Sequence, residues 1–342
     1  MMTDFRVGIV GATGAVGREV VKILRERRFP ATSVRLIASG RSEGTRLGDT
    51  VVEAISEEIL KDLDVAIFDT PDDVARRWVP IAASLGVTSI DNSAAFRMEP
   101  DVPLVIPEIN AHALRNASRR IIANPNCTTA TIALPLAPLH RLAGLSRVIA
   151  CSYQAVSGAG QKGVQQLWAE VDESAKTHQP PAMAHGDAFA HPIAFNIIPA
   201  IGSFKGEHTS EEVKVGSELR KMLDAPDVRT GVTCVRVPTF TGHGVAVHAE
   251  FTRPIDAATA RRTLMDAPGV EVVDDPGGSR YPTTLQSAGR DPCFVGRIRD
   301  DGAGALAFFA IADNLRKGAA LNTIQIAETL IEMGLLVPRV RA

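Results

Sequence analysis

The chain is poor in cysteine, and its apolar residues form no long runs. Only four cysteines occur among 342 residues, and no two are spaced as Cys-x-x-Cys. This excludes a disulfide framework and a paired-cysteine zinc site, and it favours a reducing compartment. The longest apolar runs, such as residues 132–139, contain proline and are too short to cross a bilayer. Residues Met1–Arg6 lead straight into an apolar segment, so we expect no secretory signal and a cytoplasmic protein.

The chain also lacks a strong charge of either sign. Its formal net charge is −2, which gives no reason to expect a nucleic-acid or membrane partner. The composition, 45% hydrophobic and 22% charged, is typical of a globular protein long enough for two domains. Four histidines lie at irregular spacing among prolines, and no helix places two on one face: His178, His185, His191 and His208. We therefore predict no metal site.

Strands alternate with helices in the first part of the chain. Apolar runs predict strands at residues 5–10, 33–39, 63–68 and 87–91, with helices at 18–26 and 74–85. This alternation is typical of a parallel sheet covered on both faces.

The pattern changes after about residue 147. We expect a strand at 146–156, a helix at 163–173, an irregular stretch at 178–205, and a helix at 210–223. Residues 231–239 and 245–253 resemble antiparallel strands joined by the turn 240–244, and 314–333 is a good amphipathic helix. The simplest architecture is a dinucleotide-binding domain (1–127), an inserted α+β domain (128–313), and a C-terminal helical segment (314–342) that packs back on the first domain.

A glycine turn lies between the first strand and the first helix. Its spacing is Gly11-x-x-Gly14-x-x-Gly17, where a dinucleotide fold places its pyrophosphate loop. Gly11 allows the sharp turn, Gly14 lets backbone N–H groups approach phosphate, and Gly17 lets the helix pack closely. The alternative is a tight turn with a structural role only.

The end of the second strand bears on cofactor choice. NAD sites usually carry an acidic residue there, whereas this chain has Ser39-Gly40-Arg41-Ser42. Arg41 can pair with a 2′-phosphate, which favours NADP(H), although the nearby Glu43 keeps NAD open.

Cys127 follows a Pro-Asn bend and precedes a segment that reads as the first turns of a helix. A thiol at a helix N-terminus faces unpaired N–H groups and the positive end of the dipole, which favours the thiolate. The alternative is a free cysteine that acts as a small buried hydrophobe.

Four segments occur in one order: residues 11–17, Asn-Pro-Asn-Cys-Thr-Thr at 124–129, Ser-Tyr-Gln-Ala-Val-Ser-Gly-Ala-Gly at 152–160, and Arg-Val-Pro-Thr-Phe-Thr-Gly-His at 236–243. Together they resemble the aspartate-semialdehyde dehydrogenases, and the similarity extends to residues 91–97 and 189–196. The resemblance implies an α/β fold: a Rossmann-like NADP-binding domain with an inserted catalytic and dimerisation domain of the glyceraldehyde-3-phosphate dehydrogenase-like type. It also implies a homodimer.

The activity that the resemblance implies is the NADPH-dependent reductive dephosphorylation of 4-phospho-L-aspartate to L-aspartate 4-semialdehyde. This step lies on the route to lysine (through diaminopimelate), methionine and threonine. By resemblance Cys127 forms the acyl thioester, His243 is the acid/base, and Gln154 orients the thioester. The remaining assignments are Arg236 and Glu211 for the amino-acid end of the substrate, and Arg97 and Lys214 for its phosphate, with Asn126 nearby. Besides Gly11, the residues assigned to NADP contact are Thr13, Gly14, Ala15, Val16, Arg41, Ser42, Ser157, Gly158 and Asn314. Gly244 follows His243 where many relatives carry serine.

The chemistry fits these residue types. A thiolate can expel phosphate from an acyl phosphate and leave a thioester, which splits one difficult step into two easier ones. A histidine with a pKa near neutrality can take the thiol proton and later protonate the alkoxide.

Each assignment has an ordinary structural alternative. His243 could be an exposed turn residue, Arg236 a solvent-facing strand residue, and Arg97 part of the surface. Glu211 and Lys214 could form a surface ion pair beside a capping box made by Thr209 and Glu212. Cys151, Cys234 and Cys293 are expected in the core.

Three rival functions can be weighed. N-acetyl-glutamyl-phosphate reductases typically have glycine before the cysteine and tyrosine after it, where this chain has Asn126 and Thr128. Extended short-chain dehydrogenases need Tyr-x-x-x-Lys, but Tyr153 and Tyr281 are followed four residues later by serine and leucine. A catalytically dead NADP-binding sensor would be expected to lack the thiol or the histidine.

Overall fold

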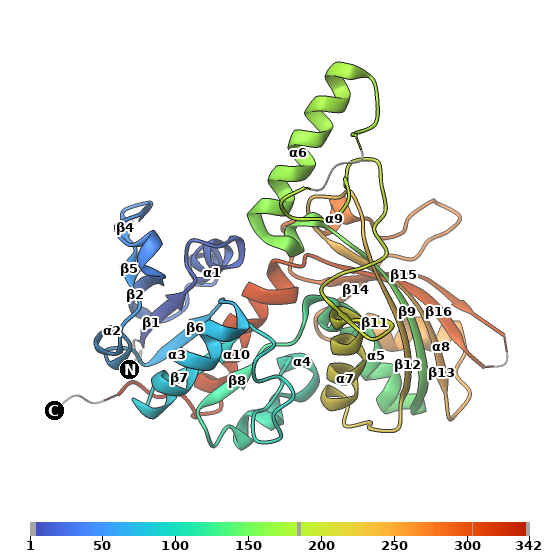
Figure 1. The fold of residues 1–342 in the computed structure, drawn as a ribbon. Helices are drawn as coiled ribbons and strands as arrows, with labels where there is room; N and C mark the ends of the chain where they lie inside the picture. The colour runs from blue at the N-terminus through green and yellow to red at the C-terminus, as the bar shows by residue number, and fades with distance from the viewer. Residues whose placement is uncertain (1–4, 183–185, 303, 340–342) are drawn as a thin grey trace. The chain divides into compact units, whose positions relative to one another are not determined.

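The computed structural model describes residues 5–182, 186–302 and 304–339 (Figure 1). The chain divides into two compact units, residues 1–126 with 319–342, and residues 127–318. Each unit is described by itself. Within the described ranges, no helix is long and apolar enough to span a membrane. His185, one of the four histidines discussed above, lies outside the described residues.

A parallel six-stranded sheet forms the centre of the first unit, with the strand order β5-β2-β1-β6-β7-β8. The bounds are β1 Phe5–Val10, β2 Ala31–Ala38, β5 Glu53–Ala54, β6 Val65–Phe68, β7 Thr88–Asp91 and β8 Ile121–Ala123. The four predicted strands are confirmed. The short edge strands β5 and β8 escaped prediction because two or three residues show no periodicity.

Helices pack on this sheet through apolar faces. The longer ones are α1 Ala15–Glu26, α3 Asp72–Ser84 and α10 Leu321–Glu332, with the short α2 Glu57–Lys61 and α4 Pro107–Asn110. The helix α10 contacts α1, α4 and β7, and its Ile324 and Leu330 join Val20 and Ile23 of α1 in the core. Each such side chain contributes roughly 1.5–3 kcal/mol on burial.

The helix predicted at 314–333 begins later than expected. A π-turn covers Arg316–Ala320 and α10 starts at Leu321. Asp313 Oδ1 accepts the N–H groups of Leu315 and Arg316 in the manner of a helix N-cap, so the predicted helix start is occupied by a capped turn that continues into the π-turn and then α10.

The second unit contains a mixed six-stranded sheet with the order β12-β9-β13-β16-β15-β14. The bounds are β9 Leu145–Gln154, β12 Arg229–Arg236, β13 His243–Phe251, β14 Val270–Val272, β15 Cys293–Asp300 and β16 Leu306–Ala312. The predicted hairpin of residues 231–239 and 245–253 is wrong. Both strands pair with β9, β12 in parallel and β13 antiparallel, so β9 lies between them.

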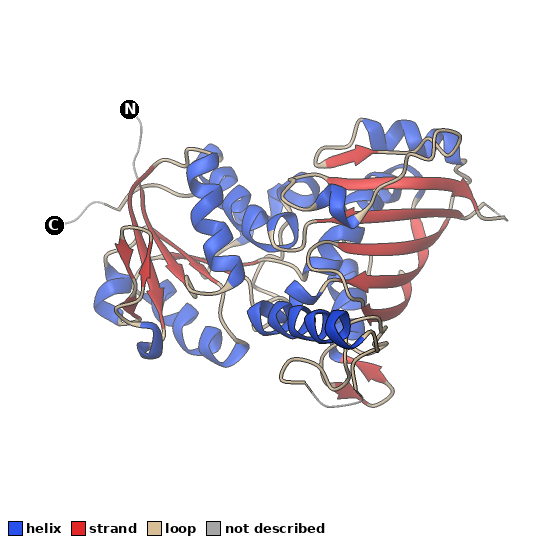
Figure 2. Cartoon of the chain, turned by 90° about the horizontal axis from the view of Figure 1, so that it is seen from above, coloured by secondary structure: helices blue, strands red, loops and turns tan. Residues whose placement is uncertain are grey.

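Helices cover one face of this sheet, as Figure 2 shows. They are α5 Cys127–Ala143, which packs on β9, β13 and β16, α7 Ser210–Met222 on β12, and α8 Ala257–Met265 on β14 and β15. The long helix α6 Gly160–Thr177 and the short α9 Thr284–Ser287 complete the set of α-helices here. The predicted capping box at the start of α7 is confirmed, with reciprocal bonds between Thr209 and Glu212.

Short elements make up the rest of the described structure. These are β3 Arg46–Leu47, β4 Thr50–Val51, β10 Phe204–Lys205, β11 His208–Thr209, and the 3₁₀ turns η1 Gly40–Ser42, η2 Ala111–Asn116 and η3 Val156–Ala159.

Candidate active site

The glycine turn of the first unit has the backbone that a dinucleotide loop needs. Gly11 has φ +94°, and a Cβ there would stand 2.0 Å from the carbonyl oxygen of Asp69. A Cβ on Gly17 would stand 2.4 Å from the carbonyl oxygen of Gly11. Packing alone explains these two glycines. Gly14 is different, because it is exposed and immediately precedes α1. The side chain of Asp69 accepts the N–H of Gly17 in the first turn, so an anion at this helix start can use only the N–H groups that precede Gly17.

The predicted selectivity residues lie in the 3₁₀ turn η1, directly after β2. Arg41 and Glu43 are both exposed, so each side chain is available to a ribose and its substituents. The geometry therefore fits either nicotinamide dinucleotide at this position.

Arg97 is buried, so its interpretation as a surface residue is wrong. Its Nε donates to the carbonyl oxygen of Asn124 and its Nη2 to that of Asn92, each at a distance of 2.8 Å. Asn126, also buried, follows two residues after Asn124. Arg97 thus holds the backbone that leads into the Asn-Pro-Asn-Cys segment.

Three predicted site residues form one cross-strand row in the second unit. Gln154 on β9 lies opposite Arg236 on β12 and opposite His243 on β13. Residues directly opposite in a sheet share a face, and all three are buried, with exposed fractions of 1%, 6% and 0%. The exposed-turn interpretation of His243 and the solvent-facing interpretation of Arg236 are therefore wrong.

The predicted helix start at Cys127 is confirmed, because Cys127 is the first residue of α5. The side chain is half-buried, and it lies at the positive end of a 17-residue helix. Behind it stands Gly318, where a Cβ would come within 2.7 Å of the Cys127 Cβ. The core prediction holds for Cys234 and Cys293 but is wrong for Cys151, which is only half-buried.

Arg236 brings positive charge to this group of residues. Burial lowers the pKa of its guanidinium, while the proximity of Cys127 and of Glu211 acts in the opposite direction. Its Nη1 donates to the carbonyl oxygen of Ala155 over 2.6 Å, and its guanidinium lies 5.7 Å from the ring centre of Phe189. A guanidinium in this position favours anionic sulfur or a carboxylate.

His243 is held by its Nδ1, which accepts the backbone N–H of Ala155 over 3.1 Å. An Nδ1 that accepts carries no proton, so the neutral ring carries its proton on Nε2. Nε2 is buried and has no hydrogen-bond partner among the described residues. Complete burial, and then the charge of Arg236, lower the pKa of His243 to about 3. The expectation of a pKa near neutrality is therefore wrong for the free protein, whose imidazole is neutral.

Gln154 uses both ends of its carboxamide. Its Oε1 accepts from Ser152 Oγ over 2.8 Å, and its Nε2 donates to Oε1 of Glu211 over 3.2 Å. Glu211 lies in the first turn of α7 and is buried, so it is not part of a surface ion pair. Lys214, one turn further along α7, is half-buried. The structure thus brings Glu211 next to the row formed by Arg236, Gln154 and His243. A carboxylate at this position can bind an ammonium group.

Ser157, Gly158 and Asn314 lie beside the same row. Asn314 exchanges hydrogen bonds with Ser157 Oγ at 3.0–3.1 Å, and its Oδ1 also accepts the N–H of Gly242 over 2.9 Å. A Cβ on Gly158 would stand 2.8 Å from Nη1 of Arg236 and 3.2 Å from Nε2 of His243. The absence of a side chain at Gly158 therefore leaves space beside Nη1 of Arg236 and Nε2 of His243, the two groups assigned to substrate and proton.

Sequence reasoning missed two contributors, Ala155 and Gly318. Ala155 acts through its main chain, and Gly318 through the absence of a side chain. Neither leaves a signal of residue type, so only the fold reveals them.

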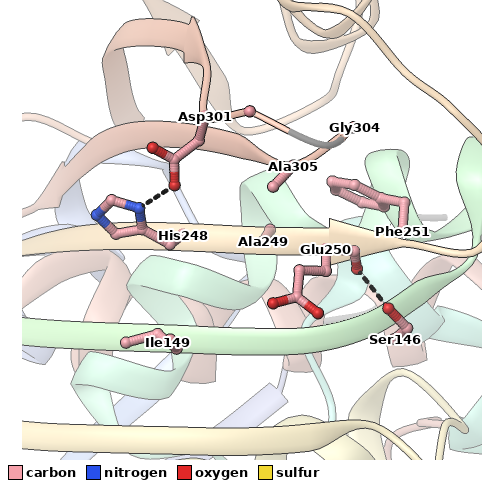
Figure 3. Close-up of a pocket in the computed structure, with 10 residues that line it drawn as sticks. Ser146, Ile149, His248, Ala249, Glu250, Phe251, Asp301, Gly304 and Ala305 are labelled. Atoms are coloured by element: carbon pink, nitrogen blue, oxygen red, sulfur yellow. Dashed lines mark hydrogen bonds and ion pairs between the residues drawn. The ribbon is translucent and has the colours of Figure 1, made fainter.

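A separate hollow lies on the other face of the second sheet (Figure 3). It has a volume of about 680 Å³, and it is lined in part by Ile149, His248, Glu250 and Asp301. Figure 3 shows Nδ1 of His248 bonded to Asp301. None of the predicted site residues lines this hollow. In the part of the chain that the structure describes, no three His, Cys, Asp or Glu side chains gather to hold a metal ion.

Comparison with known proteins places both units in one group. The family model described as semialdehyde dehydrogenase, NAD binding domain, matches residues 6–117, and the semialdehyde dehydrogenase dimerisation domain matches residues 136–317. The aspartate-semialdehyde dehydrogenase of Streptomyces akiyoshiensis is 45% identical over 94% of this chain and 97% of its own length. That of Aquifex aeolicus is 42% identical over 97% of this chain and 99% of its own length.

A solved structure agrees with these relatives. Aspartate semialdehyde dehydrogenase II from Vibrio cholerae, complexed with ASA, superposes with a TM-score of 0.90 at 38% identity. The match covers 96% of this chain and 98% of that one. The similarity in fold thus extends over nearly the whole molecule.

Proposed function

This chain belongs to the aspartate-semialdehyde dehydrogenase family, and we propose that it converts 4-phospho-L-aspartate to L-aspartate 4-semialdehyde with NADPH through a thioester on Cys127. The observation that carries the proposal is the buried row of Arg236, Gln154 and His243, together with Cys127 at the start of α5. The V. cholerae relative is described as complexed with ASA, which supports an aspartate-derived semialdehyde as the substrate class of this chain.

The first chemical step is acyl transfer to sulfur. The Cys127 thiolate attacks the acyl carbon, a C–S bond forms, and the C–O bond to phosphate breaks with both electrons leaving on phosphate. The tetrahedral oxyanion needs hydrogen-bond donors, each worth roughly 2.7–4 kcal/mol in such sites. The Nε2–H of His243 and the backbone N–H groups at the start of α5 are the donors we assign.

We assign His243 as the acid/base. With its proton on Nε2 and its Nδ1 accepting the N–H of Ala155, the neutral ring starts as a donor that can give the Nε2 proton to the alkoxide, and it can accept the thiol proton only after Nδ1 gives up its bond to Ala155. Taking a proton from the thiol would create an imidazolium, which burial and Arg236 oppose in the free protein. A phosphorylated substrate adds negative charge beside the ring and would raise the pKa of His243. Proton transfer is therefore coupled to substrate binding.

The other chain residues hold the acyl group. Gln154, fixed by Ser152 and Glu211, orients the thioester carbonyl. Arg236 binds the α-carboxylate of the substrate and Glu211 its ammonium group. Arg97 and Lys214 bind the phosphate, with Asn126 beside it. NADP(H), when bound, donates or accepts the hydride.

The residues that would hold the dinucleotide fit it. Gly11, Gly14 and the stretch Thr13–Val16 offer the pyrophosphate the N–H groups at the start of α1 that Asp69 does not use. Arg41 and Ser42 would bind the 2′-phosphate and thereby favour NADP over NAD. Ser157, Gly158 and Asn314 complete the set of proposed cofactor contacts.

Selectivity is tested at Arg41. Arg41→Ala should raise the KM for NADPH about 10-fold while leaving that for NADH nearly unchanged, because it removes one charge-assisted bond. Arg46→Ala is the matched control, another exposed arginine of the same unit. An equal effect on both cofactors would contradict NADP selection by Arg41.

We further propose a cytoplasmic homodimer that serves lysine, methionine and threonine biosynthesis. The match of residues 136–317 to a dimerisation domain supports the dimer. The face of β9 that bears Ile149 and Tyr153, 42% and 39% exposed, offers apolar surface for it.

The activity test is the phosphate-dependent oxidation of aspartate semialdehyde, followed as NADPH formation. Wild-type protein and Cys151→Ala should turn over, while Cys127→Ala should lose activity by orders of magnitude and keep NADPH binding. A wild-type protein that binds NADPH without turnover would favour the catalytically dead NADP-binding sensor. Preference for N-acetyl-glutamate semialdehyde in a substrate panel would favour an N-acetyl-glutamyl-phosphate reductase.

A further inference from the structure

Three polar residues follow three neighbouring strands of the first sheet at its carboxyl edge. Asp69 follows β6, Asn92 follows β7, and Asn124 follows β8. Because these strands are parallel and adjacent, their following residues lie side by side. This edge is where open α/β sheets bind ligands.

The side chains of these residues form one continuous chain of hydrogen bonds. Asn322, near the start of α10, donates from Nδ2 to Oδ1 of Asn124 over 2.7 Å. Asn124 donates in turn to Oδ1 of Asn92 over 2.7 Å, and Asn92 donates to Oδ1 of Asp69 over 2.9 Å. Asn124 and Asn322 are fully buried.

The series has a direction. Asn322 donates at its head, and Asn124 and Asn92 each accept on Oδ1 from one neighbour and donate from Nδ2 to the next, so the three bonds run toward Asp69. Nδ2 of Asn322 also donates to the carbonyl oxygen of Val105. Aligned bonds of this kind polarise and strengthen one another in a low dielectric. The carboxyl of Asp69 completes the series, because its Oδ1 accepts from Asn92. Burial raises the pKa of this carboxyl, while its bonds to Asn92 and to the N–H of Gly17 act in the opposite direction.

Two members of the series, Asp69 and Asn124, lie at two functional parts of the first unit. At one end, a Cβ on Gly11 would stand 2.0 Å from the carbonyl oxygen of Asp69, and one on Gly14 would stand 3.5 Å from Asp69 Oδ2. Asp69 therefore lies against the dinucleotide turn. Asn124, which accepts from Asn322 at the head of the series, begins the segment that leads within three residues to Cys127, and its Nδ2 also donates to the carbonyl oxygen of Pro125.

We propose that Asn92 and Asn322 are positioning residues that act through Asn124 and Asp69 as one unit, holding the segment before Cys127 and the dinucleotide turn in a fixed relation. This inference rests on the proposed function. It assigns these two asparagines a role in presenting the nucleophile, in addition to any contribution to stability.

The readouts are the peptide-resolved rate of Cys127 alkylation by iodoacetamide without cofactor, and the dissociation constant of NADPH. Asn92→Asp replaces the donor toward Asp69 with a second acid, and should slow alkylation and weaken NADPH binding by about 10-fold each at pH 8. Asn322→Ser removes the reach to Asn124 and should slow alkylation by a similar factor. The double variant should be no worse than the poorer single variant, since both changes break the same chain.

Asn110→Asp is the matched control. Asn110 is a buried asparagine of the same unit whose side chain bonds only to the backbone of Leu104 and Ile106 in the described hydrogen bonds. It should lose stability but keep both readouts.

Normal alkylation and NADPH binding in folded Asn92→Asp would overturn the inference, and so would additive effects in the double variant. Should Asn322→Ser fail to fold, Asn92→Asp, at a half-buried position, decides alone. Absence of turnover in the wild-type protein would instead contradict the proposed function, since alkylation does not depend on it.

Discussion

The Cα of Gly158 lies so close to Arg236 that a Cβ on the glycine would stand 2.8 Å from Nη1 of the guanidinium. The guanidinium cannot easily move away, because the same Nη1 donates to the carbonyl oxygen of Ala155. The ring of His243 stands on the same side, with Nε2 at 3.2 Å from that Cβ position. The glycine therefore preserves the spacing of the two side chains that we assign to substrate and proton.

Gly158→Ala should lower kcat/KM by about 10- to 100-fold, because a displacement of this size misaligns reacting groups. The fold should be kept, since the backbone at Gly158 has no positive φ. Gly231→Ala on β12 is the control, because its Cβ would meet only Ile149 at 3.9 Å. Steady-state kinetics with a thermal melt decides, and an unchanged kcat/KM in Gly158→Ala would contradict the assignment.

Gly318→Ala should slow the alkylation of Cys127 and lower kcat, again by about 10-fold or more. A Cβ on Gly318 would lie 2.7 Å from Cβ and 3.1 Å from Cα of Cys127, so the start of α5 itself would have to move. Peptide-resolved labelling with iodoacetamide separates Cys127 from the half-buried Cys151. Cys151 should react at its wild-type rate, and an equal slowing of both thiols would indicate a general change in the fold.

His243 should make the protein less stable in acid. Its pKa in the folded state, about 3, lies below the 6.5 of an ordinary histidine. As the pH falls below 6.5 the unfolded chain takes up a proton that the folded chain refuses, so stability is lost as the pH falls. At pH 5 the loss is up to about 2 kcal/mol. Urea denaturation at pH 7.5 and 5.0 should show a smaller loss in His243→Gln, and an identical pH dependence in both proteins would refute the prediction.

Asp91 should change the stability of the protein with pH in the direction opposite to His243. Burial is the main cause that raises the pKa of this carboxyl to about 6, although Ser93 donates to it from both its N–H and its Oγ. The folded state thus binds this proton more tightly than the unfolded state, and stability falls as the pH rises from 3.8 to 6. The contribution changes by about 2 kcal/mol between pH 4.5 and 7.5.

Asp91→Asn keeps the shape and removes that titration. Relative to wild type, the variant should therefore gain stability on going from pH 4.5 to 7.5. Asp64→Asn is a control for which the opposite change of stability with pH is expected. Burial would raise the pKa of Asp64, but its bonds to Arg6 and to the N–H of Arg339 lower it. Comparison of denaturation midpoints at the two pH values gives the sign in each case.

The sequence predicted the first sheet well, because its strands are apolar runs separated by amphipathic helices such as α1. It also placed Cys127 correctly at a helix start, since the Asn124-Pro125-Asn126 segment separates β8 from α5. Both signals are local. Local patterns of two to twenty residues are what propensity and periodicity can report.

The arrangement of the second unit could not be predicted in the same way. β12 and β13 are neighbours in sequence, yet β9 lies between them, and only that order places Gln154 opposite both Arg236 and His243. The neutral state of His243 has the same origin. Its burial and its bond to the N–H of Ala155 both follow from this strand order, so a pKa near neutrality was the natural expectation from sequence and was wrong.

The asparagine chain shows a third limit. Asn92, Asn124 and Asn322 are far apart in sequence and have no shared motif. They meet because two of them follow adjacent parallel strands and the third begins a helix from the end of the chain. Hydrogen-bond partners at such separations depend on the tertiary fold alone.

The most direct measurement of the central claim is mass spectrometry of the protein quenched in acid after mixing with 4-phospho-L-aspartate in the absence of NADPH. We predict one added aspartyl group, located by peptide mapping on Cys127, and its disappearance when NADPH is added before the quench. An aspartyl group on Cys151 or another residue, or turnover without any adduct on Cys127, would contradict the account.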